Sequence, residues 1–150
     1  MKKNSTRIGA AKDDHLGSLI STRVEKFLIS LDHCRFATID KTGYPHCVPV
    51  GYLYSRPYIY VPTNSRTKKV SNLLKNPKCC IIGDTYQKGL GRGVMLQGTA
   101  HVALKEEYLE LKDKIEKISK WDLASWSIDG RPVDAIIRFN PEHIVVIGTL

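Results

Sequence analysis

Two adjacent lysines, Lys68 and Lys69, stand near the predicted start of a helix, where cations are electrostatically unfavourable. Ser65 is the expected N-cap, and Arg66 adds a third cation. A helix N-terminus already carries about half a positive charge, so each cation there costs about 0.3–1 kcal/mol. A bound anion reverses this, because backbone N–H groups, helix dipole and ammonium groups all attract it. Taken alone, the lysine pair is more typical of an exposed basic helix, whose ammonium groups are screened by salt, than of a phosphate site. The hydroxyl groups nearby belong to Thr63, Ser65 and Thr67.

A second unusual stretch, Val48-Pro49-Val50-Gly51, falls inside a predicted strand. Proline has no backbone donor, so Pro49 favours an edge strand that faces a ligand. Gly51 lets a flat ring approach the backbone, because it has no side chain. A simple bulge would place the same two residues there. The stretch therefore indicates either the wall of a ligand site or an irregular strand.

The elements that must position these residues are mostly strands. Alternating or continuous apolar runs predict them, and helical spacing of apolar residues predicts three helices. The chain shows hairpin-linked runs of strands without regular β-α alternation, which favours an antiparallel barrel or sandwich with helices at its edges. We expect a loop over 86–93, a bulge or bend at Gly98 and a turn over 140–142. The expected strands are 35–40, 45–54, 58–63, 78–84, 94–104, 133–139 and 143–148, and the expected helices are 18–31, 66 to about 75, and 105–120.

Length and composition indicate one soluble domain. The chain has 150 residues, of which 42% are hydrophobic and 25% charged, as in ordinary globular proteins. We expect residues 1–17 to form a flexible basic arm and residues 18–150 a single domain. No apolar run is long enough for a bilayer, and none of signal-peptide length follows the basic N-terminus, so a cytoplasmic protein without membrane contact is expected.

The net charge of +8 attracts anions. Nucleic acid is disfavoured as a partner, because the interleaved surface aromatics of a single-strand binder are missing. The four cysteines form no C-x-x-C pair and have no zinc spacing with the histidines, so buried reduced thiols and no metal are expected. No serine–histidine–acid or cysteine–histidine arrangement is recognisable, and no catalytic residue is assigned.

Three segments in order carry a family resemblance: RFATIDKTGYPHCVPVGYLY, IYVPTNSRTKKVSNLLKNPKCCII and GRGVMLQGTAHVAL. A strand with A-T-I-D, a G-x-P hairpin, a strand with V-P-V and a Y-x-x-T before a basic helix ending in N-P resemble the flavin-binding split-barrel proteins of the pyridoxamine-phosphate oxidase family. The resemblance covers about residues 33–104. It implies a mainly β fold, an antiparallel Greek-key split β-barrel, and a homodimer with one FMN in each of two clefts at the subunit interface.

The resemblance also implies roles for individual residues. The strand Val48, Pro49, Val50 and Gly51 would run along the isoalloxazine ring, and Thr63 would lie beside the flavin. Lys68 and Lys69 would grip the phosphate, with the Thr67 hydroxyl beside them, and a loop with Arg92 and Gly93 would reach the flavin.

Some positions depart from the enzymes that give the family its name. Val48 stands where these have a phosphate-binding arginine, and Gly93 where they have a glutamine. Trp121, Trp126 and Arg131 do not match their C-terminal substrate motif in spacing. These departures argue against true pyridoxamine-phosphate oxidase activity.

The resemblance therefore implies a divergent FMN-binding oxidoreductase with a small-molecule redox substrate. In such a protein the cofactor carries the redox chemistry, and the chain supplies binding and orientation. Two alternatives share the barrel: a member that binds the deazaflavin coenzyme or haem, and a non-catalytic flavin carrier or sensor.

Overall fold

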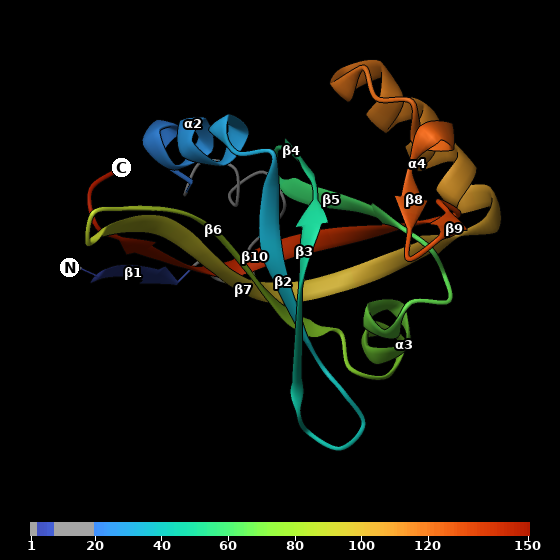
Figure 1. Ribbon diagram of the computed structural model, residues 1–150, viewed down its shortest axis with the longest axis horizontal. Coiled ribbons are helices and arrows are strands. Elements are labelled where there is room, and N and C mark those ends of the chain that lie inside the picture. The colour runs from blue at the N-terminus through green and yellow to red at the C-terminus, as the bar shows by residue number, and fades with distance from the viewer. Residues whose placement is uncertain (1–2, 8–19) are drawn as a thin grey trace.

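The protein folds around one antiparallel sheet, seen in a computed structural model that describes residues 3–7 and 20–150 (Figure 1). The order of its strands is β3-β2-β6-β7-β10-β5-β4, with β1 paired to β10. The sheet curls so that β3, at one edge, returns to contact β5. The predicted mainly β, antiparallel fold with edge helices is confirmed. The strands are β1 (Lys3–Arg7), β2 (His33–Ile39), β3 (Pro45–Gly51), β4 (Leu53–Ser55), β5 (Tyr58–Thr63), β6 (Lys78–Gln87), β7 (Leu90–Leu104), β8 (Ser127–Ile128), β9 (Arg131–Pro132) and β10 (Ala135–Ile147), and the helices are α2 (Thr22–Ser30), α3 (Lys68–Lys75), α4 (Lys105–Ser119) and the 3-10 helix η1 (Leu123–Ser125).

The two faces of the sheet bury different apolar clusters. The inner face and helices α2 and α3 enclose the main core, in which Phe36, Ile81, Leu96 and Phe139 are fully buried. Helix α4 packs on the opposite face of β7 and β10 over a smaller cluster that includes Ile136. Successive residues of a strand point to opposite faces, which is why one long strand serves both clusters.

The last strand corrects a prediction. We expected two strands joined by a turn at 140–142, but β10 runs unbroken from Ala135 to Ile147. Its register against β7 shifts between Pro141 and His143, so the proline lies at a bulge and not in a turn. Gly98, where a bulge or bend was expected, lies in β7 opposite Pro141. A side chain would not fit there, because a Cβ on Gly98 would be 2.0 Å from the carbonyl oxygen of Asn140.

The predicted loop at 86–93 is also wrong. Strands β6 and β7 continue to Gln87 and Leu90, which pair with each other across a two-residue turn. Lys88 and Gly89 both have positive φ (49° and 79°), the backbone that a tight hairpin turn requires. Arg92 therefore lies in strand β7, paired with Thr85, and not in the expected loop.

The N-terminal region is partly outside the described residues. Of the arm expected over 1–17, Lys3–Arg7 form β1, which pairs antiparallel with β10. The rest of the arm lies outside the described residues. Among residues 3–7 and 20–150, no helix combines the length and the apolar character needed to cross a bilayer.

Candidate functional site

The start of α3 is built differently from the prediction. Thr67, not Ser65, is the N-cap, so Lys68 and Lys69 occupy the first two helical positions. The first turn contains no acidic residue, and the Thr67 hydroxyl makes no capping bond to it, because it donates instead to the carbonyl oxygen of Asn64 at 2.8 Å. The backbone donors of this turn therefore have no carboxylate of the helix to satisfy them.

Contacts from distant strands fix this helix. Ser65 donates from its backbone N–H and its hydroxyl to the carboxylate of Asp134, at 2.6 and 2.9 Å. Asn72, buried on the inner side of α3, donates to the Thr38 hydroxyl of β2 at 3.0 Å. These contacts hold the turn before α3 and the buried face of the helix.

The two lysines lie in different environments. Lys68 is exposed, and its ammonium nitrogen is 3.7 Å from a carboxylate oxygen of Asp40. Lys69 is only 6% exposed, and no carboxylate of the described residues lies within ion-pair distance of it. Burial lowers the pKa of Lys69, while the charge of Asp129 acts in the opposite direction. A buried ammonium without a close counter-charge is costly, so Lys69 fits an anion.

A cavity of about 340 Å³ lies between this helix start and the edge strand β3. Seven of the ten predicted site residues line it: Val48, Pro49, Val50, Gly51, Thr67, Lys68 and Lys69. Pro49 is on an edge strand, as predicted, since β3 pairs with β2 alone. His46 also lines the cavity, and its buried Nδ1 has no hydrogen-bond partner among the described residues.

Three predicted residues do not line this cavity. Thr63 is completely buried beneath the helix start, with its hydroxyl 3.5 Å from that of Thr67. Arg92 donates to Thr85 at 3.1 Å, and its guanidinium lies over the ring of Phe27. Gly93 is packed against the backbone of β6. Within one chain, Arg92 and Gly93 are therefore separated from the lysines.

A small hairpin missing from the sequence prediction completes the wall. Strands β8 and β9 pair only through Ser127–Pro132 and Ile128–Arg131, and Ser127, Ile128 and Asp129 line the cavity. The Asp-Gly turn at 129–130 was the available signal, because this dipeptide is typical of tight hairpins. Each strand has only two residues, which are too few to show the alternation of apolar and polar residues that predicts a strand.

The indole of Trp126 occupies the space above Gly51. A Cβ on Gly51 would be 3.2 Å from the Cη2 atom of this ring. The glycine does let a flat ring approach the backbone, but that ring belongs to the chain itself. Trp126 also packs against Trp121, with ring centroids 4.8 Å apart, so the two tryptophans fix the base of the hairpin.

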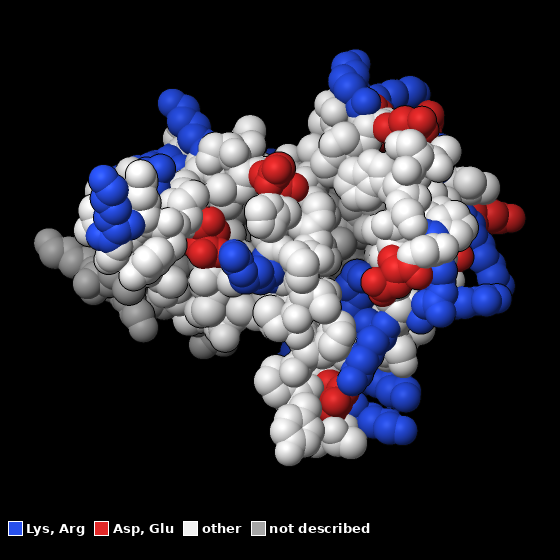
Figure 2. Space-filling model, viewed as in Figure 1, with Lys and Arg blue, Asp and Glu red and all other residues white. Residues whose placement is uncertain are grey.

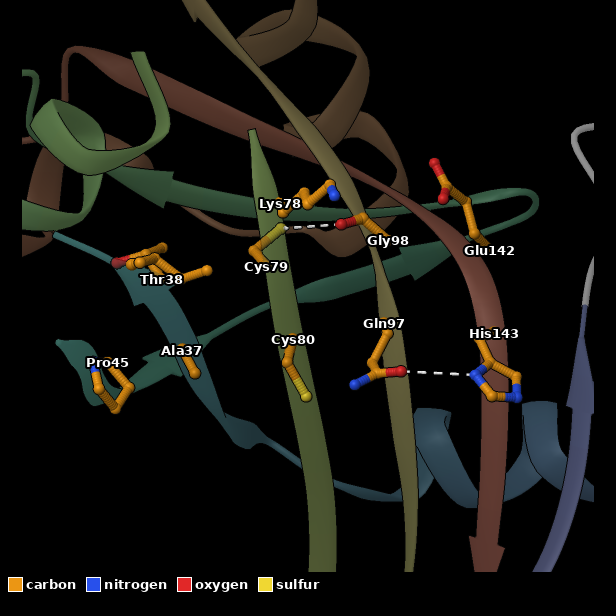
Figure 3. A pocket seen from close by; sticks show the side chains of 11 residues that line it. Ala37, Thr38, Pro45, Lys78, Cys79, Cys80, Gln97, Gly98, Glu142 and His143 are labelled. Atoms are coloured by element: carbon orange, nitrogen blue, oxygen red, sulfur yellow. Dashed lines mark hydrogen bonds between the residues drawn. The ribbon is translucent and has the colours of Figure 1, made fainter. Parts of the chain in front are cut away.

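A larger cavity, of about 630 Å³, lies on the outer face of β2, β6, β7 and β10 (Figure 3). Figure 3 shows Cys80, Gln97 and His143 on three neighbouring strands, with Gln97 and His143 joined by a hydrogen bond. Lys78 is the only lysine or arginine among the residues of 3–7 and 20–150 that line this cavity. Its lining does not combine cations with a helix start, so the smaller cavity is the better candidate for an anion.

Comparison with known proteins agrees with the fold. The sequence profile of the pyridoxamine 5'-phosphate oxidase family matches residues 20–148. General stress protein 26 of Bacillus subtilis is 31% identical over 128 residues, which cover 80% of this chain and 84% of that protein.

Two solved structures share the architecture at lower identity. General stress protein 26 of Bacillus anthracis superimposes with a TM-score of 0.64 at 18% identity, over 85% of this chain and 93% of the other. The FAD binding protein of Mycobacterium smegmatis gives a TM-score of 0.63 at 18% identity, over 87% and 97%. The predicted split-barrel fold is confirmed, and the chain belongs to the pyridoxamine 5'-phosphate oxidase family.

Proposed function

We propose that the protein binds FMN and is a flavin-dependent oxidoreductase with a small-molecule substrate. The observation that carries the proposal is Lys69, a buried ammonium at a helix start with no carboxylate within ion-pair distance among the described residues. A phosphate there would accept hydrogen bonds from the first turn of α3 and from both lysines. The FAD binding protein of Mycobacterium smegmatis, by its name, supports a flavin as the ligand.

The remaining lining residues fit the ring of a flavin. Val48, Pro49 and Val50 offer an apolar edge strand, and His46 offers a buried ring nitrogen that lacks a partner among the described residues. When bound, FMN supplies electron transfer between a donor and an acceptor. Lys68 and Lys69 would hold its phosphate, β3 would lie along its ring, and the β8–β9 hairpin would shield one side of it.

The proposal includes a homodimer with the flavin at the interface. Arg92 and Gly93 lie away from the lysines of their own chain, so a second copy would have to bring them to the flavin. The sheet face in Figure 3 supports a second copy as its cover, because the small or apolar residues Ala37 and Pro45 lie on it. Deazaflavin coenzyme and haem remain the alternative ligands of the same cavity.

The absorbance spectrum of the purified protein tests the ligand. After incubation with FMN and removal of free ligand, we expect a flavin spectrum at about one FMN per chain. A protein that retains no FMN would refute the proposal, and a haem spectrum on purification would replace it. Light scattering at micromolar concentration tests the assembly: a flavin-loaded monomer would refute the interface site.

A further inference from the structure

The β8–β9 hairpin places one carboxylate, that of Asp129, in the lining of the cavity that Lys68 and Lys69 also line. Its turn residues Asp129 and Gly130 both have positive φ (51° and 75°). Asn64 donates to the carbonyl oxygen of Pro132 at 2.7 Å, and Arg131 donates to that of Arg66 at 3.4 Å. In Figure 1 the hairpin lies between α4 and α3. Its base is thus held, and its turn is directed at the start of α3.

Of the described residues that line this cavity, Asp129 is the only acidic one. Its charge acts on Lys69, although the two are farther apart than an ion pair. Lys68 faces a different carboxylate, that of Asp40, at 3.7 Å. The two lysines therefore each have one carboxylate nearby, and neither carboxylate belongs to α3.

We infer that Asp129 determines the charge specificity of the cavity, competing with the phosphate of a flavin for Lys69. This inference rests on the proposed function. The carboxylate offsets only part of the cost of the buried ammonium in the free protein, because the two groups are farther apart than an ion pair, and it repels a phosphate in the complex. It therefore weakens binding of a phosphorylated flavin and leaves binding of an unphosphorylated one unaffected, which keeps the ligand exchangeable.

The test compares FMN with riboflavin, which has the same ring and no phosphate. Asp129→Asn removes the charge and suits the backbone, because asparagine tolerates positive φ. We expect FMN affinity to rise about two- to five-fold, the range of a solvent-exposed charge interaction, and riboflavin affinity to stay the same. The gain in FMN affinity should be smaller at high salt, because dissolved ions screen the charge of Asp129. Quenching of flavin fluorescence gives both dissociation constants.

Two matched variants serve as controls. Asp113→Asn makes the same charge change on the exposed side of α4, where Asp113 pairs with Lys117, and should leave both affinities unchanged. Asp129→Glu keeps the charge and should behave like the wild type.

The outcomes separate the inference from the proposed function. Wild-type protein that binds FMN, with Asp129→Asn unchanged or altered equally for both flavins, overturns the inference alone. Failure of both proteins to bind FMN overturns the proposed function and the inference with it.

Discussion

The carboxylate of Asp134 binds both polar groups of Ser65, accepting from the backbone N–H at 2.6 Å and from the hydroxyl at 2.9 Å. Asp134 immediately precedes β10, so a contact across 69 residues fixes the turn before α3. The N-cap, Thr67, has no side-chain cap bond of its own. The position of Lys68 and Lys69 thus depends on the C-terminal strand.

Replacing Asp134 with alanine should destabilise the protein and disturb the helix start. The variant removes two hydrogen bonds to Ser65 at a solvent-exposed site, and a typical hydrogen bond contributes about 0.5–1.5 kcal/mol net. Urea denaturation measures the free energy of unfolding. Asp113→Ala, at an exposed position of α4, is the control, and an equal effect of the two variants would contradict the role given to Asp134.

The contact between Asp134 and Ser65 explains why the N-cap of α3 was predicted at the wrong residue. Ser65 has the right residue type for an N-cap, but its hydroxyl is used by Asp134, which no local pattern links to it. The cavity residues on β3 and α3 were predictable, because proline in a strand and cations at a helix start are local anomalies. Asp129 was not, because it reaches the cavity only through the tertiary position of its hairpin.

The errors in the fold prediction have a similar cause. Pro141 is a turn residue by composition, yet β10 continues through it as a bulge opposite Gly98. Lys88 adopts positive φ, which its residue type disfavours, and thereby closes a hairpin where a loop was expected. Strand pairing on both sides overrides local preference at both places.

Lys69→Met should make the ligand-free protein more stable. The change removes a buried ammonium and keeps an apolar side chain of similar length, a gain of about 0.5–2 kcal/mol. Thermal unfolding without flavin measures it. Lys75→Met, at an exposed position near the end of α3, should give no such gain. A Lys69→Met variant that is less stable than the wild type would contradict the view that the Lys69 ammonium lacks a close counter-charge.

Lys69 should also make the stability of the protein depend on pH. Burial holds the pKa of Lys69 below its ordinary value of 10.5. Between the folded and unfolded values the unfolded chain binds more protons, so this lysine makes stability increase as pH rises through that window. Urea denaturation across the alkaline range should show a difference between wild type and Lys69→Met that narrows with rising pH. A difference in unfolding free energy that stays constant across this pH range would contradict the lowered pKa of Lys69.

Gly51→Val should displace Trp126. A Cβ added at residue 51 would lie 3.2 Å from the indole, so the two further methyl groups of valine would overpack the contact, at a cost of about 1–3 kcal/mol. The change should appear as altered tryptophan fluorescence and lower stability. Adding Trp126→Ala should relieve the overpacking, so a double variant whose losses simply add would argue against direct contact.

Two of the four cysteines should resist alkylation in the native protein. Burial raises the pKa of Cys34 to about 12 and also raises that of Cys79, so both stay protonated and inaccessible near neutral pH. Mass spectrometry after iodoacetamide treatment should find them modified only when denaturant is present. Rapid native modification of Cys34 would contradict its place in the core.

The dissociation constant of FMN for wild type, Lys69→Ala and Lys75→Ala tests the central claim most directly. Lys69→Ala should weaken binding by about 1.5–3 kcal/mol, the range of a hydrogen bond to a charged group. Lys75→Ala removes an equal charge from the far end of the same helix and should change little. Equal affinity of wild type and Lys69→Ala would contradict the account, because the buried ammonium would then have no part in holding the phosphate.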